Sequence, residues 1–183
     1  MYIYGGYDDY GLNCNDMFQY SFAKNEWVKV RMLGKPPDKF HHVAVAHEGS
    51  MYLLGGQGAD KTLYDFRFGT NTLSAVQCAG YVPDVRQGHK AVAFGRKLYL
   101  IGGADNLSCY NDCIMFHFET GIWKKHNRNI KFSDEDDIFP RRYFHSICVR
   151  TISEEIVVFG GKNIHNYAFN DIWCMPLCLF SPI

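Results

Sequence analysis

In Met51-Tyr52-Leu53-Leu54-Gly55-Gly56, a short apolar stretch ends in a glycine pair, and the same pattern occurs three more times in the chain. The four stretches are MYIYGG (1–6), MYLLGG (51–56), KLYLIGG (97–103) and IVVFGG (156–161). Each is short, rich in aliphatic and aromatic residues and closed by glycine, which is typical of a buried β-strand. The first glycines of successive pairs are 50, 47 and 58 residues apart, and a recurrence of this length indicates a repeat architecture.

Other elements recur in register with the glycine pairs. A basic-x-x-His unit precedes three of the pairs, and its His lies 13, 13 and 15 residues before the first glycine; the units are Lys39 to His42, Arg86 to His89 and Arg142 to His145. An Asn-Asp pair follows three of the glycine pairs and ends at Asp16, Asp112 and Asp171. Trp27 and Trp123 each lie 11 residues after the Asp of their copy. Several elements at one spacing indicate four copies of one structural unit.

A stretch near each Asn-Asp position alternates with a period of two. Large apolar residues occupy every second position in all four copies: Phe18, Tyr20 and Phe22; Tyr64, Phe66 and Phe68; Ile114, Phe116 and Phe118; Trp173, Met175 and Leu177. Because successive side chains of a strand point to opposite faces of its sheet, we expect these residues to lie on the buried face of a strand.

Together, basic-x-x-His, apolar-Gly-Gly, Asn-Asp and a spaced Trp resemble the kelch motif, which forms one four-stranded blade of a β-propeller. The resemblance covers essentially the whole chain and implies an all-β fold, a partial kelch β-propeller with an arc of about three and a half to four four-stranded antiparallel blades. We expect one domain, 1–183, with blades at about 1–31, 32–79, 80–126 and 139–178. Closed propellers have roughly 4–8 blades, so we expect a piece of a longer protein, or an arc that a second chain or a partner completes.

Most of the repeated residues are expected to be framework. They are the glycine pairs, the Asp residues and the Trp residues: Gly5, Gly6, Gly55, Gly56, Gly102, Gly103, Gly160, Gly161, Asp16, Asp112, Asp171, Trp27 and Trp123. We expect each Asn-Asp to start the turn into the third strand by bonding nearby backbone amides. The two Trp side chains are expected to pack on the next blade.

The basic-x-x-His unit precedes the strand that the resemblance makes innermost, near the mouth of the central channel. Copies from neighbouring blades would meet there and ring one mouth with Lys39, Arg86, Arg141 and Arg142. Guanidinium groups around a recessed opening suit a carboxylate, because they bind it bidentately. The alternative is that each basic side chain pairs with an Asp of a neighbouring blade and that each His is a packed channel residue.

Composition narrows the function classes. The formal net charge is zero, which gives no support to generic binding of nucleic acid or of anionic membranes. No run of 18 apolar residues is present, so we expect no membrane span; we also expect no signal peptide and a cytoplasmic or nuclear protein. The seven cysteines are expected to be reduced thiols, and one His per repeat does not make a chelate, so we expect neither metal nor cofactor.

Most kelch proteins are interaction modules, so the resemblance implies a protein or peptide ligand. The chain also resembles kelch substrate receptors of cullin-RING ubiquitin ligases, which read the C-termini of their targets. This resemblance implies that Arg86, Arg141, Arg142 and Ser146 hold a terminal carboxylate. It also implies that an elongin/cullin adaptor binds through segments that are absent from the 183 residues given. The alternatives are an actin-binding scaffold and, more remotely, an enzyme like the kelch copper radical oxidase. No catalytic motif is found, so we expect no catalytic residue and no enzyme.

Overall fold

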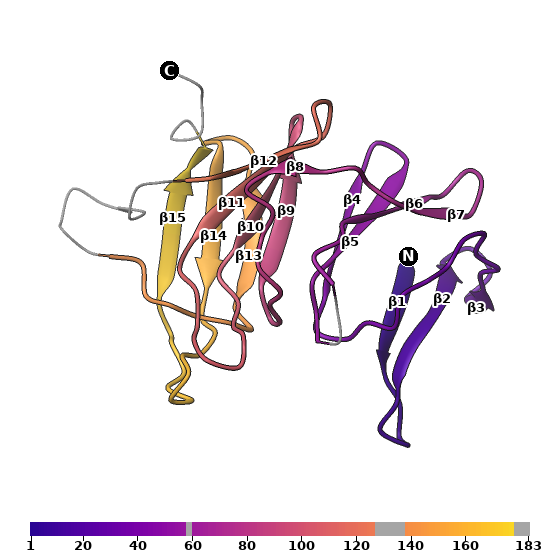
Figure 1. Ribbon diagram of the computed structural model, residues 1–183, viewed down its shortest axis with the longest axis horizontal. Coiled ribbons are helices and arrows are strands. Elements are labelled where there is room, and N and C mark those ends of the chain that lie inside the picture. Colours follow the sequence, from indigo (N-terminus) through magenta and orange to yellow (C-terminus); the bar gives the residue numbers. More distant parts are fainter. Residues whose placement is uncertain (58–59, 127–137, 178–183) are drawn as a thin grey trace. The chain divides into compact units, whose positions relative to one another are not determined.

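The strands of the protein follow from the short apolar stretches of its sequence. The structure is a computed structural model that describes residues 1–57, 60–126 and 138–177 (Figure 1). In these ranges it contains fifteen β-strands and no α-helix, so the predicted all-β fold class is confirmed. No helix in the same ranges is long and apolar enough to cross a lipid bilayer.

The chain forms two compact units, Met1–Gln77 and Cys78–Ile183, and each unit contains two sheets. In the first unit, one sheet consists of β1 (Tyr2–Tyr7), β2 (Asn13–Ser21) and β3 (Glu26–Lys29), in that order. The other consists of β4 (Val43–His47), β5 (Ser50–Leu54), β6 (Tyr64–Arg67) and β7 (Thr72–Ala75). Neighbouring strands of both sheets are antiparallel, as the repeat pattern predicts.

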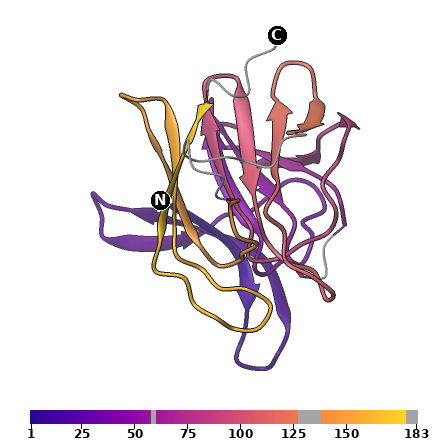
Figure 2. The same cartoon turned by 90° about the vertical axis from the view of Figure 1, so that its left-hand side faces the viewer.

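The second unit repeats this arrangement. One sheet contains β9 (Lys90–Phe94), β10 (Lys97–Ile101), β11 (Cys113–His117) and β12 (Ile122–Lys125), paired antiparallel in chain order. The other contains β13 (Ser146–Arg150), β14 (Glu155–Phe159) and β15 (Ile172–Pro176). The first strands of the two sheets, β9 and β13, contact each other (Figures 1 and 2). In Figure 2 the sheet of β13 to β15, coloured orange to yellow, faces the viewer.

One short strand was not predicted. β8 (Ala79–Gly80) pairs in parallel with β12 at the edge of its sheet, where the sequence indicates only a loop. The first unit contains the same contact as a single bridge, in which Leu33 pairs in parallel with Thr72 of β7. Two residues are too few to show a hydrophobic period, and this explains why the sequence pattern did not reveal the strand.

Tight turns join the first two strands of the two sheets that contain all four strands of a blade, β4–β7 and β9–β12. Glu48 and Gly49 connect β4 and β5 and have φ angles of 42° and 80°. Positive φ at both central residues of a two-residue loop is the type I′ geometry, whose twist matches that of antiparallel strands. The turn therefore sets the register of the hairpin.

Apolar side chains from both sheets of a unit form its core. In the first unit, Tyr4 and Met17 of the β1–β3 sheet lie in one cluster with Met51, Leu53 and Phe66 of the β4–β7 sheet.

In the second unit the core again joins the two sheets. The buried cluster contains Tyr99 and Ile101 from one sheet and Ile156, Val158 and Met175 from the other. Because these residues are almost completely withdrawn from water, burial of apolar surface holds the sheets of each unit together.

The predicted buried face of the third strands is right in three copies and wrong in the first. Phe66, Phe116 and Met175 are buried. In the first sheet, however, Met17 is buried and Phe22 is 75% exposed. The Met17 side of β2 faces the β4–β7 sheet, and within the first unit no other sheet covers the side that carries Phe22.

The glycine pair after β10 shows why a side chain is excluded at these positions. Gly102 has a φ of +61°, and a Cβ atom there would lie 2.7 Å from the carbonyl oxygen of Arg142 in the next sheet. At Gly103 the added atom would lie 2.7 Å from Cβ of His89 in the same sheet. The first glycine therefore allows the next sheet to approach, and the second allows the His of its own sheet to pack.

Replacing Gly102 by Ala should lower the free energy of unfolding by clearly more than replacing Gly95 by Ala. Both glycines have positive φ, so each variant carries a backbone strain of about 1–2 kcal/mol. Only at Gly102 does the new methyl group also collide with a neighbouring sheet, since nothing lies within 4 Å at Gly95. Urea unfolding of the two variants measures the difference, and equal losses would contradict the close-approach explanation.

Candidate functional site

Arg142 is the centre of a buried ion pair. Its side chain is 0% exposed and lies over the rings of Phe139 and Phe169, with Cζ 4.7 and 4.2 Å from the two ring centres. The guanidinium donates to both carboxylate oxygens of Asp171 at 2.6 and 2.7 Å, and to the carbonyl oxygen of Gly160 at 2.9 Å. These bonds lower the pKa of the Asp171 carboxyl group. We call this bidentate pair the Arg–Asp clamp.

Arg86 forms the same clamp in the preceding sheet. Its guanidinium donates to the two carboxylate oxygens of Asp112 at 2.6 and 3.2 Å and to the carbonyl oxygen of Gly102 at 3.0 Å. The Cζ atom lies 3.9 Å from the ring centre of Tyr110. Each clamp therefore joins the loop before the first strand of a sheet to the residue before its third strand.

Lys39 takes the corresponding place in the β4–β7 sheet. Its ammonium group is fully buried, donates to the carbonyl oxygen of Gly55 at 3.3 Å and lies 3.9 Å from a carboxylate oxygen of Asp60. Burial lowers the pKa of Lys39, and the Asp60 carboxylate opposes this shift. This sheet has no Asn-Asp pair, and Asp60 provides the acid instead.

The five predicted ligand residues thus separate into two groups. The donors of Lys39, Arg86 and Arg142 are directed into their own sheets, so we correct their predicted contact with a carboxylate ligand. The alternative of a framework role fits better, although the clamp acids belong to the same sheet and not to a neighbouring one. Arg141 and Ser146 are exposed and stay candidates for ligand contact.

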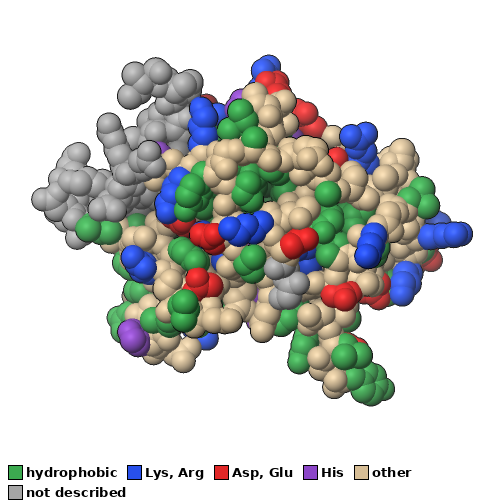
Figure 3. Space-filling model, viewed as in Figure 1, with side chains coloured by type: hydrophobic (Ala, Val, Ile, Leu, Met, Phe, Trp, Pro, Cys, Tyr) green, Lys and Arg blue, Asp and Glu red, His purple; other side chains and the backbone are tan. Residues whose placement is uncertain are grey.

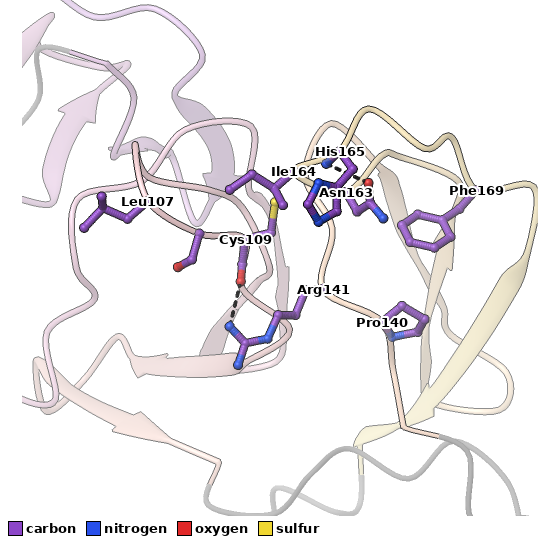
Figure 4. A pocket seen from close by; sticks show the side chains of 9 residues that line it. Leu107, Cys109, Pro140, Arg141, Asn163, Ile164, His165 and Phe169 are labelled. Atoms are coloured by element: carbon purple, nitrogen blue, oxygen red, sulfur yellow. Dashed lines mark hydrogen bonds between the residues drawn. The ribbon is translucent and has the colours of Figure 1, made fainter.

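Arg141 lines a hollow of about 400 Å³ between three loops of the second unit (Figure 4). One wall is the loop after β10 with Leu107, and the other is the loop after β14 with Ile164 and Phe169. The guanidinium of Arg141 points toward Cys109 and donates to its carbonyl oxygen at 3.3 Å. A cation beside apolar walls suits a ligand that combines an apolar group with a negative charge.

Ser146 lines a second hollow of about 400 Å³, not the one that contains Arg141. This hollow lies on the β13–β15 sheet, beside Phe159, Gly161, Lys162 and Phe169. The structure therefore does not bring Arg141 and Ser146 together in one pocket.

The histidines of the basic-x-x-His units lie close to cations; His89 and His145 are buried, and His42 is partly buried. Burial lowers the pKa of His145 to about 3, and the charges of Arg142 and Lys90 act in the same direction. Burial also lowers the pKa of His42 to about 4, with Lys39 and His41 contributing. Both rings are therefore neutral packing groups at physiological pH.

The framework residues differ from their predicted roles in two respects. Asp112 and Asp171 accept hydrogen bonds from guanidinium groups, where turn formation was expected. Trp123 is buried on Phe116 of its own sheet, with ring centres 4.9 Å apart. Trp27 lies on Tyr20 at 5.0 Å and is half exposed, so its predicted packing on the next blade is not found.

Three residues that shape the loops were missed. Asp8, Asp105 and Asn163 each stand two residues after a glycine pair and accept two backbone N–H bonds through a side-chain oxygen. These Asx turns stabilise the backbone at the tips of the loops. One of them is the apolar tip between β1 and β2, which protrudes at the lower right in Figure 3. An Asp or Asn at one fixed distance in three copies is the signal that could have revealed them.

Comparison with known proteins agrees with this repeat geometry. The model of the KLHDC2/KLHL20/DRC7 Kelch-repeats domain matches residues 1–133. The chain belongs to this kelch-repeat family. Its fold class is that of a partial kelch β-propeller, and its kelch repeats make it a protein–protein interaction module.

Several curated proteins share the kelch region. The chain is 30% identical over 160 residues (85% of the chain) to Ras guanine nucleotide exchange factor F of Dictyostelium discoideum. It is 27% identical over 203 residues (99% of the chain) to kelch domain-containing protein 3 of Bos taurus. It is 31% identical over 147 residues (75% of the chain) to N-(sulfonatooxy)prop-2-enimidothioate sulfolyase of Thlaspi arvense. The matches cover 14%, 51% and 40% of these relatives, respectively.

Replacing Arg142 by Ala should destabilise the kelch sheet strongly, whereas replacing its neighbour Arg141 should not. Removal of one partner of a buried ion pair costs about 3–5 kcal/mol, and the partial exposure of Asp171 favours the lower end. Arg141→Ala affects an exposed side chain, for which about 0.5 kcal/mol or less is expected. Chemical denaturation of both variants checks this. Similar stability of the two variants would mean that the clamp contributes little.

Acid should destabilise the protein through its buried histidines. The folded pKa of His145 is about 3 and its ordinary value is 6.5, so below pH 6.5 the unfolded chain binds more protons. At pH 5 this lowers the free energy of unfolding by about 2 kcal/mol for this His. His145→Gln should flatten the pH dependence between pH 7 and pH 5, measured by urea unfolding.

Proposed function

We propose that this kelch module binds a short peptide that ends in a free carboxylate. The observation that carries the proposal is the hollow lined by Arg141, in which a guanidinium lies beside apolar walls from Leu107, Ile164 and Phe169. The carboxylate would bond to the guanidinium, and the apolar side chain before it would contact the walls. Arg141 is held toward this hollow by its bond to the carbonyl oxygen of Cys109.

The Arg–Asp clamp of Arg142 supports the choice of Arg141 as the residue that contacts the ligand. Arg142 is the immediate neighbour of Arg141, but its guanidinium is occupied by Asp171 and Gly160. Arg141 is exposed and Arg142 is fully buried, so one Arg is committed to the sheet and the other to the surface. The clamp thereby fixes the backbone from which Arg141 extends.

A role as the substrate receptor of a cullin-RING ubiquitin ligase extends this proposal. Residues 86–123 and 139–177 resemble kelch domain-containing protein 10, whose relatives read target C-termini. In such a receptor the kelch module binds the substrate, and an elongin/cullin adaptor would bind through segments outside these 183 residues. The proposed location is the cytoplasm or the nucleus.

We also propose that the module acts by binding and not by catalysis. The buried ionisable side chains Arg86, Arg142 and Lys39 are held in framework contacts. The relatives include a guanine nucleotide exchange factor and a sulfolyase, whose names denote different activities. What these proteins share with the chain is the repeat, and this supports a scaffold whose loops choose the ligand.

Arg141→Ala should remove the preference of the module for free peptide C-termini. Short peptides that end in an apolar residue, made with a free carboxylate or with a terminal amide, serve as fluorescent probes in an anisotropy titration. Loss of a charge-assisted bond of about 1.5–3 kcal/mol corresponds to a loss of roughly tenfold to a hundredfold in affinity for the free-ended probes.

Arg150→Ala is the matched control, since Arg150 is exposed, pairs with Glu155 and is not one of the residues that line the hollow. Its affinity for free-ended peptides should equal that of the unmodified chain. Equal binding of free and amidated peptides by the unmodified chain would refute carboxylate recognition.

A further inference from the structure

A second polar side chain, Asn163, lines the hollow that contains Arg141. In Figure 4 the Asn163 side chain lies across the hollow from Arg141. Both walls of the hollow consist of described residues of the second unit, from the loop after β10 on one side and the loop after β14 on the other. The Asn163 amide is therefore available to a ligand that Arg141 binds.

The Asx turn determines which end of the Asn163 amide can serve a ligand. Its Oδ1 atom accepts the backbone N–H groups of His165 at 2.9 Å and of Tyr167 at 3.1 Å. A backbone N–H can bond only to the oxygen of the amide, so the oxygen is turned into the loop and the Nδ2 group is turned away from these two donors. Among the described residues, no hydrogen bond occupies the Nδ2 group.

The described residues that line the hollow include no Asp and no Glu. Asp105 belongs to the facing loop, but both of its carboxylate oxygens are occupied. One accepts the backbone N–H groups of Leu107 and Ser108, and the other accepts the Tyr110 hydroxyl at 2.5 Å. The hollow therefore offers hydrogen-bond donors from two sides, and its ligand supplies the acceptors.

The Asx turn itself does not require an amide at this position. Asp8 and Asp105 hold the corresponding places in two other repeats, and each bonds two backbone N–H groups through one side-chain oxygen, as Asn163 does. An Asp then presents its second carboxylate oxygen, an acceptor, where the Asn presents an NH₂ group, a donor. The donor at Asn163 is therefore an addition to the turn and not a part of it.

We propose that Asn163 Nδ2 donates to the carbonyl oxygen of the last peptide bond of the ligand, while Arg141 binds the terminal carboxylate. This inference rests on the proposed function and narrows its ligand class. The end of a peptide chain presents these two acceptors one residue apart, whereas a simple aliphatic carboxylate has only the first. The two donors together select a peptide C-terminus from among the ligands that combine an apolar group with a negative charge.

Two fluorescent probes that differ in one carbonyl oxygen test this contact. Each is a short peptide with a C-terminal leucine side chain and a free carboxylate. In one probe an ester replaces the last peptide bond, and in the other a trans alkene replaces it, so both lack the N–H and only the ester has the carbonyl oxygen. In anisotropy titrations the unmodified chain should bind the ester probe about threefold to tenfold more tightly, the effect of one uncharged hydrogen bond.

Asn163→Asp should abolish the difference between the two probes. Because Asp8 and Asp105 form the same turn, the variant should keep the loop and its stability in urea unfolding while it exchanges the donor for an acceptor. Its added charge acts on both probes alike, so the ratio of the two affinities reports the carbonyl contact. Asn166→Asp is the matched control: Asn166 is exposed in the same loop and does not line the hollow, so the ratio should not change.

Equal affinity of the unmodified chain for the two probes, or a ratio that Asn163→Asp leaves unchanged, overturns this inference. The free and amidated peptides, measured with Arg141→Ala, separate that result from failure of the proposed function. If the unmodified chain prefers free ends and Arg141→Ala loses the preference, carboxylate recognition stands even where the Asn163 contact is wrong. If the unmodified chain shows no preference for free ends, the proposed function and this inference are both overturned.

Discussion

The buried pairing of a basic side chain with an acid of the same sheet is the interaction on which the other features of this structure depend. A buried guanidinium is tolerated only when its donors are satisfied, and here two carboxylate oxygens and a glycine carbonyl oxygen satisfy Arg142. The pair joins positions 29 residues apart in the chain. It thereby fixes where the loop before the first strand enters each sheet.

The same residue also joins one sheet to the next. While its side chain is bonded within its own sheet, the backbone of Arg142 is bonded to Gly103 and Tyr110 of the preceding one. A side chain at Gly102 would obstruct this approach, and this accounts for the glycine in the repeat. Sequence elements that lie far apart are therefore parts of one contact.

Much of this fold can be read from the sequence, because strand patterns and glycine pairs depend on local chemistry. The choice of acid for each Arg could not be read, since in a repeat the acids of the same sheet and of the neighbouring sheet recur at equal intervals. The sequence also could not show which face of β2 is buried. Met17 and Phe22 are both apolar, and only the position of the neighbouring sheet decides which one is buried.

At the candidate site, too, the sequence pattern could not predict which of two neighbouring side chains is buried. Arg141 and Arg142 are adjacent and chemically identical, yet one is exposed and the other is fully buried. Composition and spacing place both near one loop, and only the packing of the folded chain decides which of the two side chains bonds within the sheet. Ser146 was grouped with them by family resemblance, but it lies in a different hollow.

The Asx turns after the glycine pairs have a consequence for how such a protein can change over time. Asp105 holds its loop from within by bonding the amides of Leu107 and Ser108, and Leu107 at the tip is 86% exposed. Substitutions at the tip therefore leave the supporting bonds intact. Ligand preference can diversify there by single mutations at little thermodynamic risk, which gives the scaffold a high capacity for evolutionary innovation.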